Sequence, residues 1–290
     1  MSQSQTIHAP EVIHDVAALR ARVRGWRAEG LRVALVPTMG ALHEGHASLV
    51  AEGARRADRV VTSIFVNPTQ FAAGEDFSKY PRTLPTDLAV LARVGGHAAF
   101  APSVEEMYPP HFCTGVTVAG PAKADLEDRF RPTHFAGVAL IVAKLLNQAA
   151  ADCAIFGEKD YQQLKVVTQM ARDLDIGTEI VGAPTVRESD GLAMSSRNVY
   201  LSPEDRARAP AIYKALTQAA TRIAAGEALA HVMADARENL VSAGFAVDYI
   251  EARHAETLAR VARRIDGPIR LLAAAKIGAT RLIDNIPVSL

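Results

Sequence analysis

The first part of the chain repeats an order of apolar strands and amphipathic helices. Buried, β-branched runs predict strands at residues 33–36, 60–66, 98–102, 115–118, 152–156 and 179–182. Apolar residues at helical spacing predict helices at residues 11–29, 44–56, 85–94, 138–149 and 164–174. Strand–helix–strand units build parallel sheets, so this part is predicted to be an α/β fold with a Rossmann-like parallel sheet.

The pattern changes after Gly182, where the domain boundary is expected. A helix is predicted from the Ser202–Pro203 cap to residue 225, and a second one at residues 228–242. Strands are predicted at residues 245–251, 269–277 and 280–286. We therefore expect a Rossmann-like domain at residues 1–182 and a smaller α+β domain at residues 183–290, which covers the site of the first as a lid.

The densest chemistry lies between the strand at residues 33–36 and the helix after it. Pro37 is expected to end the strand pairing, because proline has no N–H to donate, and Gly40 lets the backbone approach a ligand closely. A helix that begins at such a loop directs unpaired N–H groups and the positive end of its dipole into the crevice above the sheet. This arrangement predicts an anion site, with phosphate as the usual occupant.

Two histidines, His43 and His46, lie three residues apart at this helix start. Both imidazoles can face the same crevice and donate to phosphate oxygens, and Gly45 between them removes a side chain that would crowd a ligand. Two other interpretations stay open: a pair of surface histidines beside a cap, or half of a zinc site. The zinc site is disfavoured, because no cysteine or other histidine nearby has ligand spacing.

Polar side chains also follow later strands, at the edge of the sheet where ligands bind in open α/β folds. Asn67 and Gln70 suit a substrate with hydroxyls and a carboxylate, although Asn67 could equally cap a turn. After the strand at residues 152–156, Lys159 offers a point charge for a phosphate. Its neighbours in the same predicted cavity are Gly157, Asp160 and Gln163. The alternative is a well-capped helix with a solvated Lys–Asp pair.

Two further segments carry candidate ligands. Ser195, Ser196 and Arg197 place two hydroxyls and a guanidinium together, which can bind a polyphosphate, although such a composition is also common in ordinary loops. Asp87 lies in the first turn of the helix at residues 85–94, where it either complements the helix dipole or contacts Mg²⁺.

Composition excludes several classes of protein. Lys+Arg and Asp+Glu both number 32, and this balance argues against a nucleic-acid binder. The two cysteines are too few for a disulfide framework, which favours a reducing, cytoplasmic setting. No apolar run approaches the ~20 residues of a membrane span, and the N-terminus has no signal-peptide pattern.

Five segments, in order, resemble the pantoate–β-alanine ligase family, also called pantothenate synthetases. They are PTMGALHEGH at residues 37–46, SIFVNPTQF at 63–71, RPTHFAGV at 131–138, FGEKDYQQL at 156–164 and GLAMSSRN at 191–198. This family belongs to the nucleotidyl-transferring Rossmann proteins with a His-x-Gly-His motif, here His43 to His46. The resemblance covers nearly the whole chain, which makes it much more specific than any single motif.

The resemblance implies ATP-dependent condensation of pantoate with β-alanine through a pantoyl adenylate, with release of AMP and pyrophosphate. It implies a homodimer, Mg²⁺ as a cofactor with Asp87 as its contact on the protein, and catalysis by His43, His46, Lys159, Ser195, Ser196 and Arg197. The implied ATP contacts are Pro37, Thr38, Met39, Gly40, His43, His46, Gly157, Lys159, Asp160, Val186, Met194, Ser195, Ser196 and Arg197. The implied pantoate contacts are Met39, Asn67, Gln70, His134 and Gln163.

Two other functions stay open at this point. A nucleotidyl transferase that adenylates another small acid without forming an amide would share the His-x-Gly-His loop. A regulator that senses ATP without turnover would share the nucleotide contacts. Release of AMP that depends on an amine acceptor separates the ligase from both.

Overall fold

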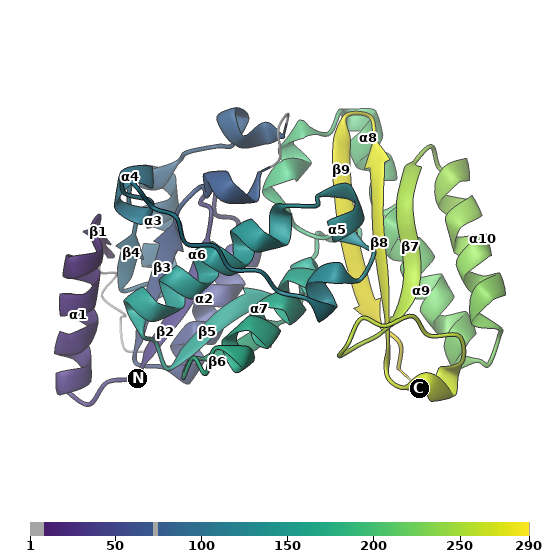
Figure 1. The fold of residues 1–290 in the computed structure, drawn as a ribbon. Helices are drawn as coiled ribbons and strands as arrows, with labels where there is room; N and C mark the ends of the chain where they lie inside the picture. Colours follow the sequence, from purple (N-terminus) through teal and green to yellow (C-terminus); the bar gives the residue numbers. More distant parts are fainter. Residues whose placement is uncertain (1–8, 72–74, 290) are drawn as a thin grey trace, which may run out of the picture.

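The computed structural model describes residues 9–71 and 75–289, which build two sheets side by side (Figure 1). The larger sheet is parallel and has the strand order β1-β4-β3-β2-β5-β6. Its strands are β1 (Glu11–Ile13), β2 (Val33–Thr38), β3 (Arg59–Ile64), β4 (Ala98–Phe100), β5 (Cys153–Gly157) and β6 (Glu179–Ala183). The predicted Rossmann-like parallel sheet is therefore confirmed.

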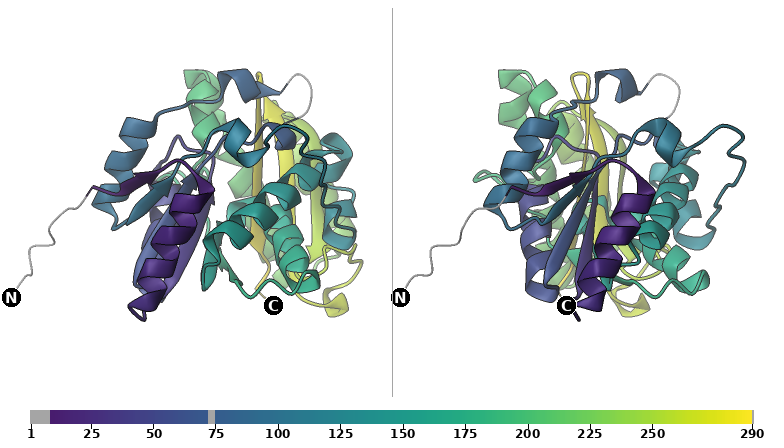
Figure 2. Two further views of the ribbon diagram at one scale, coloured as in Figure 1. Left: turned by 60° about the vertical axis from the view of Figure 1, so that its left-hand side comes forward. Right: turned by 90° about the vertical axis from the view of Figure 1, so that its left-hand side faces the viewer.

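Helices cover both faces of this sheet (Figure 2). They are α1 (Val16–Ala28), α2 (Glu44–Arg56), α3 (Leu84–Arg93), α6 (His134–Ala149) and α7 (Tyr161–Asp173), with short turns at α4 (Val104–Met107) and α5 (Glu127–Phe130). Val33 and Leu35 pack into a core with α1, α6 and α7, whereas Ala34 and Val36 face α2 and α3. Successive strand residues point to opposite faces, so coverage on both sides explains the continuous apolar runs.

The smaller sheet is antiparallel, with the order β7-β8-β9, and lies in the C-terminal part. This part contains α8 (Pro203–Arg208), α9 (Ala211–Ala224), α10 (Leu229–Ser242), β7 (Ala246–His254), β8 (Ile269–Ile277) and β9 (Thr280–Pro287). Side chains of α9 and α10 form a core with one face of this sheet. Tyr249, Leu272 and Ala274 turn the other way and pack against Leu126 and Tyr161 of the N-terminal part.

The strand order fixes where a ligand can bind. From β2 the chain moves outward through β3 to β4, and it returns to the other side of β2 as β5 and then β6. The order of strands therefore reverses between β2 and β5. In open α/β sheets a crevice forms at such a point, beyond the carboxyl ends of the strands.

Four secondary-structure predictions were wrong. Residues 11–13 form the edge strand β1 rather than a helical turn, and α1 begins after Asp15, whose carboxylate accepts from the N–H of Ala18 at 2.7 Å. Residues 115–118 form no strand; Val116 and Val118 instead pack against the cores. The helix expected at residues 202–225 is divided into α8 and α9 at Pro210, which has no N–H to continue the α8 ladder.

The fourth correction concerns Pro37, which lies within β2 and is in register with Ser63 of β3. The ladder with β5 ends at Leu35, before the proline. The strand therefore continues on one side, where Thr38 O accepts from the N–H of Phe65 at 3.1 Å.

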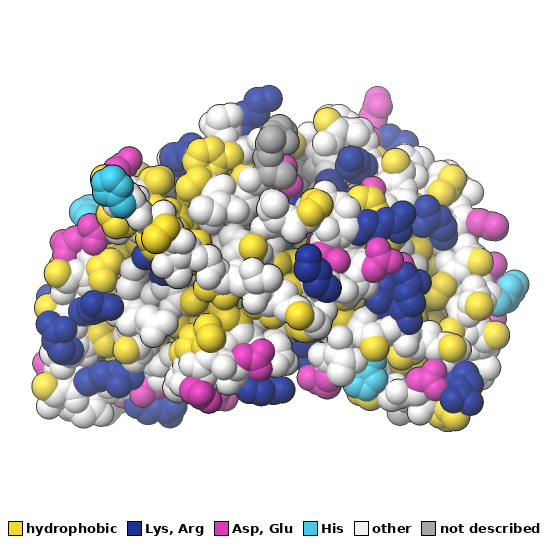
Figure 3. Space-filling model, viewed as in Figure 1, with side chains coloured by type: hydrophobic (Ala, Val, Ile, Leu, Met, Phe, Trp, Pro, Cys, Tyr) yellow, Lys and Arg dark blue, Asp and Glu magenta, His cyan; other side chains and the backbone are white. Residues whose placement is uncertain are grey.

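Two observations concern the helices and one face of the surface. Across residues 9–71 and 75–289, no helix is both long enough and apolar enough to cross a membrane. On the face shown in Figure 3, basic and acidic side chains are interspersed, in line with the formal net charge of zero.

Candidate active site

The loop between β2 and α2 is held from behind by a buried carboxylate. Asp87, 1% exposed, accepts from the backbone N–H of Ala41 at 3.1 Å and of Leu42 at 2.8 Å, and from the Thr83 hydroxyl at 3.1 Å. Ala41 has a left-handed backbone, with φ 51°. A Cβ on Gly40 would lie 3.0 Å from Asp87 Oδ2, so glycine allows the close approach. Asp87 therefore positions the loop.

The two histidines of the loop accept hydrogen bonds from backbone N–H groups at the start of α2. His43 Nδ1 accepts from the N–H of Gly45 at 3.1 Å, and His46 Nδ1 accepts from the N–H of His43 at 3.3 Å. Because each Nδ1 is an acceptor, the proton of each neutral ring is on Nε2. Both rings therefore carry an Nε2–H donor, and the two ring centroids lie 4.1 Å apart.

The surroundings keep both rings neutral. Burial, together with the nearby Lys159, lowers the pKa of His43 to about 4. Burial and the neighbouring His43 lower the pKa of His46 to about 3. The histidines therefore act as hydrogen-bond donors without charge near neutral pH, rather than as cations.

Gly45 has a role beyond the one the sequence suggested. A Cβ at this position would lie 2.8 Å from Cε1 and 2.9 Å from Nδ1 of His43. Glycine therefore lets the His43 ring fold back over the helix start, and Gly45 also lines the smaller cavity described below.

Asn67 holds together the turn that follows β3. Its Oδ1 accepts from the N–H and hydroxyl of Thr69, at 3.3 and 3.0 Å, and from the Tyr108 hydroxyl at 2.7 Å. Its amide donates to Gly137 O and to Gln70 Oε1, both at 3.2 Å. The capping interpretation of Asn67 is therefore confirmed, and its side chain orients Gln70.

His134, at the start of α6, is fixed by two partners. The Arg131 guanidinium can only donate, so His134 Nε2 accepts from it at 3.2 Å, and Nδ1–H donates to Gln70 O at 2.9 Å. Burial and Arg131 lower the pKa of His134 to about 4. Arg131 also pairs with Glu75 at 2.7 Å, and Gln70 Nε2 lies 2.9 Å from Met39 Sδ.

The segment after β5 brings charge to the same crevice. Lys159 Nζ lies 3.7 Å from Asp160 Oδ2. Burial tends to raise the pKa of Asp160, but Lys159 and Arg197 outweigh this effect and lower it. Asp160 therefore stays ionised beside two cations.

The loop that follows β6 folds back so that its ends meet. The N–H of Met194 donates to Val186 O at 3.0 Å, which places these two residues next to each other. Ser195 then caps a 3₁₀ turn at Ser196–Tyr200, accepting from the N–H of Arg197 at 3.3 Å. The Ser196 hydroxyl lies 3.2 Å from the hydroxyl of Tyr80.

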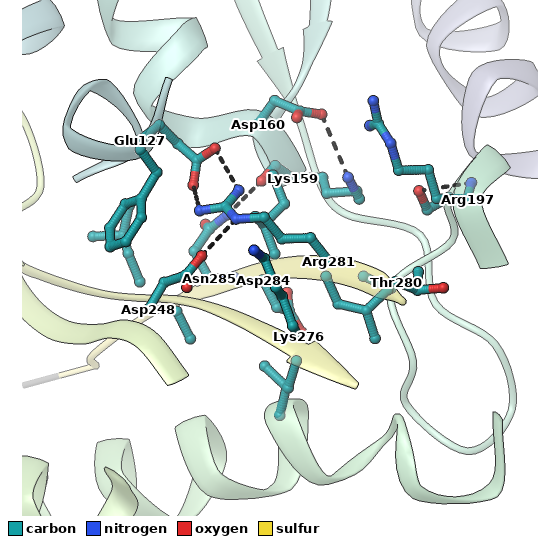
Figure 4. A pocket seen from close by; sticks show the side chains of 18 of the residues that line it. Glu127, Lys159, Asp160, Arg197, Asp248, Lys276, Thr280, Arg281, Asp284 and Asn285 are labelled. Atoms are coloured by element: carbon teal, nitrogen blue, oxygen red, sulfur yellow. Dashed lines mark hydrogen bonds and ion pairs between the residues drawn. The ribbon is translucent and has the colours of Figure 1, made fainter. Parts of the chain in front are cut away.

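These segments enclose a cavity of about 210 Å³ at the switch point between β2 and β5. Every candidate residue from the sequence lines it except Gly40 and Asp87, which lie behind the loop. A second cavity of about 640 Å³ lies between the two sheets and shares Arg131, His134, Lys159, Asp160, Gln163, Ser195 and Arg197 with the first (Figure 4).

The sequence reasoning missed part of the lining. Arg131, which belongs to the RPTHFAGV segment of the resemblance, and Tyr80 line the smaller cavity, although neither side chain was assigned a ligand contact. An apolar wall was also missed, formed by Leu49, Phe65, Val138, Ile141, Val142, Leu145 and Phe156. The signal for the α6 part of this wall was present, since α6 is apolar nearly all round and yet follows a segment of candidate ligands.

The donor set is that of an anion site and does not fit a metal held by the protein. In residues 9–71 and 75–289, no group of three or more His, Cys, Asp or Glu side chains could hold a metal ion. Both oxygens of Asp87 are already engaged by the loop. The geometry thus favours a positioning role for Asp87 over the magnesium contact that the sequence suggested.

Known proteins share both this sequence and this fold. Residues 11–287 match the Pantoate-beta-alanine ligase family. The chain belongs to this family. Pantothenate synthetase 2 of Bradyrhizobium diazoefficiens is 58% identical over 280 residues, covering 97% of this chain and 99% of that protein. The pantothenate synthetase of Nitrobacter hamburgensis is also 58% identical, with the same coverage.

Solved structures of this family superpose over nearly the whole chain. The pantothenate synthetase of Thermus thermophilus has a TM-score of 0.90 and 46% identity, covering 96% of this chain and 99% of that one. The Francisella tularensis ligase, solved with β,γ ATP and β-alanine, has a TM-score of 0.79 and 32% identity, covering 96% and 98%. The activity is that of an AMP-forming carbon–nitrogen ligase, which joins pantoate to β-alanine to form pantothenate.

Proposed function

We propose that this ligase works through a pantoyl adenylate made in the cavity between β2 and β5. A pantoate carboxylate oxygen attacks the α-phosphorus of ATP, an acyl–phosphate bond forms, and pyrophosphate leaves. The β-alanine amine then attacks the acyl carbon, loses a proton and displaces AMP. One observation carries this proposal. A single cavity contains hydrogen-bond donors that suit phosphate and, beside them, amide side chains next to an apolar wall.

Phosphate binding is assigned to donors from three separate segments. His43 and His46 supply neutral Nε2–H groups, and Lys159 and Arg197 supply positive charge. The hydroxyls of Ser195 and Ser196 complete the set. These groups stabilise charge that develops on the α-phosphate and on the leaving pyrophosphate, so no covalent enzyme intermediate is required.

Adenine is assigned to the paired ends of the loop after β6, and ribose to the segment after β5. Val186 and Met194 lie next to each other and can pack against the base. Gly157 permits close approach, and the ionised Asp160 can accept from ribose hydroxyls. Backbone and side-chain contacts from Pro37, Thr38 and Met39 are assigned to the phosphate side, whereas Gly40 lies behind the loop against Asp87.

Pantoate is assigned to the apolar-walled end of the cavity. Gln70 and Gln163 are the amides proposed to contact it, with Met39 beside Gln70. Asn67 and His134 are engaged with protein partners, so they support this pocket chiefly by orienting Gln70. The apolar wall suits the methyl groups of the substrate.

The cation and the assembly are further parts of the proposal. Mg²⁺ would arrive on the phosphate oxygens of ATP, since the described residues offer no carboxylate cluster for it. We also propose a cytoplasmic homodimer in which residues 1–182 bind nucleotide and pantoate, and residues 183–290 act as a lid that supplies the loop at residues 186–197. The complex of the Francisella tularensis relative supports ATP and β-alanine as ligands, and the two unpaired cysteines support the reducing setting. Sedimentation velocity tests the subunit number.

The decisive assay follows pyrophosphate release with ATP, Mg²⁺ and pantoate, with and without β-alanine. We expect sustained release and pantothenate formation only when both substrates are present. Pyrophosphate release that does not change when any amine is added would instead indicate adenylyl transfer without amide formation.

Lys159→Ala tests the charge assignment. We expect a fall in turnover of about 10²–10³-fold with the fold intact, because the lysine acts on charge that develops in the transition state. Lys165→Ala is the matched control; it lies on α7 and pairs with Glu256 at 2.8 Å, outside both cavities. Adenylate formation at a near-normal rate in Lys159→Ala would sink the assignment.

A further inference from the structure

One residue of the C-terminal sheet holds the backbone beside Lys159. The amide nitrogen of Asn285, on β9, donates to both Glu158 O and Lys159 O at 2.9 Å. Asn285 is 3% exposed, and its Oδ1 accepts from Arg270 Nε at 2.7 Å, which fixes the orientation of the amide. Arg270 also donates to Glu158 Oε2 at 3.0 Å.

Besides Asn285, the pair between Arg270 and Glu158 ties this turn to the C-terminal sheet. Residues Glu158–Asp160 form a single 3₁₀ turn between β5 and α7, without a side-chain cap of its own. The turn sets the direction in which the Lys159 side chain leaves the backbone, and the two hydrogen bonds from Asn285 help to fix that direction. The position of Lys159 therefore depends on a residue 126 positions away in the chain.

Asp284, the residue before Asn285 on β9, holds the loop at residues 186–197, which carries the other proposed ATP contacts. Asp284 accepts two hydrogen bonds from Arg187, at 2.6 and 2.9 Å, and it lies almost fully buried. Arg187 also donates to Gly191 O at 3.1 Å and stacks on the Tyr213 ring at 3.8 Å. Arg187 thereby closes the loop whose two ends are Val186 and Met194.

We propose that Asp284 and Asn285 are positioning residues that fix the Lys159 turn and the loop at residues 186–197 relative to each other. Neighbouring residues of a strand point to opposite sides, so one dipeptide can reach both segments. Asp284 and Asn285 lie beside Lys159 at the larger cavity (Figure 4). The inference rests on the proposed ATP contacts of Lys159 and Arg197. It gives the C-terminal part a function beyond covering the cavity.

A double-mutant cycle separates positioning from general stability. Turnover at saturating ATP, pantoate and β-alanine is measured for Asn285→Ala, Lys159→Ala and the double variant. If Asn285 acts through Lys159, Asn285→Ala lowers turnover by about 10–100-fold in the natural chain but by less than about 3-fold once Lys159 is absent. The same cycle pairs Asp284→Ala with Arg197→Ala.

Two further variants serve as controls for the double-mutant cycle. Glu256→Ala removes the ion pair with Lys165, which joins the two parts of the chain away from the Lys159 turn and the loop at residues 186–197. Turnover of this variant is expected to stay within about 2-fold of that of the wild-type protein. Asn285→Ser retains a single donor and is expected to fall between Asn285→Ala and the natural chain. It keeps the test informative if the alanine variant fails to fold, as judged by circular dichroism.

The outcomes distinguish the two proposals. Equal losses from Asn285→Ala in both backgrounds, or turnover unchanged by it, would overturn the positioning role while leaving the proposed function in place. Full turnover in Lys159→Ala would overturn the proposed role of Lys159 and the positioning inference with it. If Glu256→Ala lost as much turnover as Asn285→Ala, weakened contact between the two parts of the chain would explain both losses. That result would overturn the positioning role of Asn285.

Discussion

Replacing Asp87 with alanine removes the acceptor of two backbone N–H groups in the loop between β2 and α2. They belong to the half-buried Ala41 and the buried Leu42 and lie 3.1 and 2.8 Å from the carboxylate. A buried donor left unpaired costs about 1–3 kcal/mol, so the Leu42 group alone is expected to lower the unfolding free energy by that amount, and the Ala41 group adds to the loss. The left-handed backbone of Ala41 adds to the tendency of the loop to relax.

The same change is expected to slow the reaction, although Asp87 does not line either cavity. The loop ends in His43 and leads into His46, so its relaxation moves both Nε2–H donors. A displacement of about 1 Å at reacting groups costs about 10²-fold in rate. Asp87→Asn keeps one acceptor oxygen and is expected to show a smaller loss of both stability and rate.

The measurements are urea unfolding and steady-state turnover, each repeated over a range of Mg²⁺ concentrations. Asp58→Ala is the matched control, since Asp58 also accepts from a backbone N–H, that of Arg32 at 2.9 Å, but at the opposite end of the sheet. If Asp87 positions the loop, its variants lose stability and turnover with the same Mg²⁺ dependence as the natural chain. A variant of normal stability that needs more Mg²⁺ would refute this reasoning and restore the metal contact.

Two further predictions concern the histidines. Gly45→Ala places a Cβ about 2.8 Å from the His43 ring, so it is expected to displace the ring and lower turnover with little change in fold. Circular dichroism checks the fold, and unchanged turnover would contradict the prediction. Burial lowers the pKa of His43, His46 and His134 to between about 3 and 4, from 6.5 when exposed. The unfolded chain then binds more protons below pH 6.5, so the unfolding free energy is expected to fall from about pH 6.5 to about pH 4; a flat urea-unfolding profile over this range would be inconsistent with neutral buried rings.

The parallel sheet and its cavity were predictable because they follow local rules. Apolar runs at residues 33–36 and 152–156 are long enough to be buried on both faces, and helical spacing marks the segments between strands. Chemistry in parallel sheets gathers at the carboxyl ends of strands, so His43, Asn67 and Lys159 could be expected in one crevice before the strand order was known.

The parts that sequence reasoning missed depend on contacts between distant residues. β1 is only three residues long, and its pairing with β4 has no signal in a three-residue pattern. Asp87 resembles any first-turn carboxylate, because the N–H groups that it binds lie 45 and 46 positions away. Nothing local to Gly45 shows that the His43 ring folds back onto it, so this second requirement for glycine could not be predicted.

The charge state of the histidines shows how packing changes the chemistry of a motif. From sequence, His43 and His46 can be neutral donors or cations, and both forms suit phosphate. Their mutual cap uses Nδ1 as an acceptor, and burial beside Lys159 disfavours a second proton. Positive charge at the cavity then comes from Lys159, Arg197 and Arg131, of which Arg131 is paired with Glu75. The proposed phosphate contacts therefore combine uncharged donors on the N-terminal loop with Lys159 and Arg197, on segments bonded to β9. If Lys159 and Arg197 make the proposed phosphate contacts, their attachment to β9 leads us to expect that phosphate recognition requires contact between the two parts of the chain.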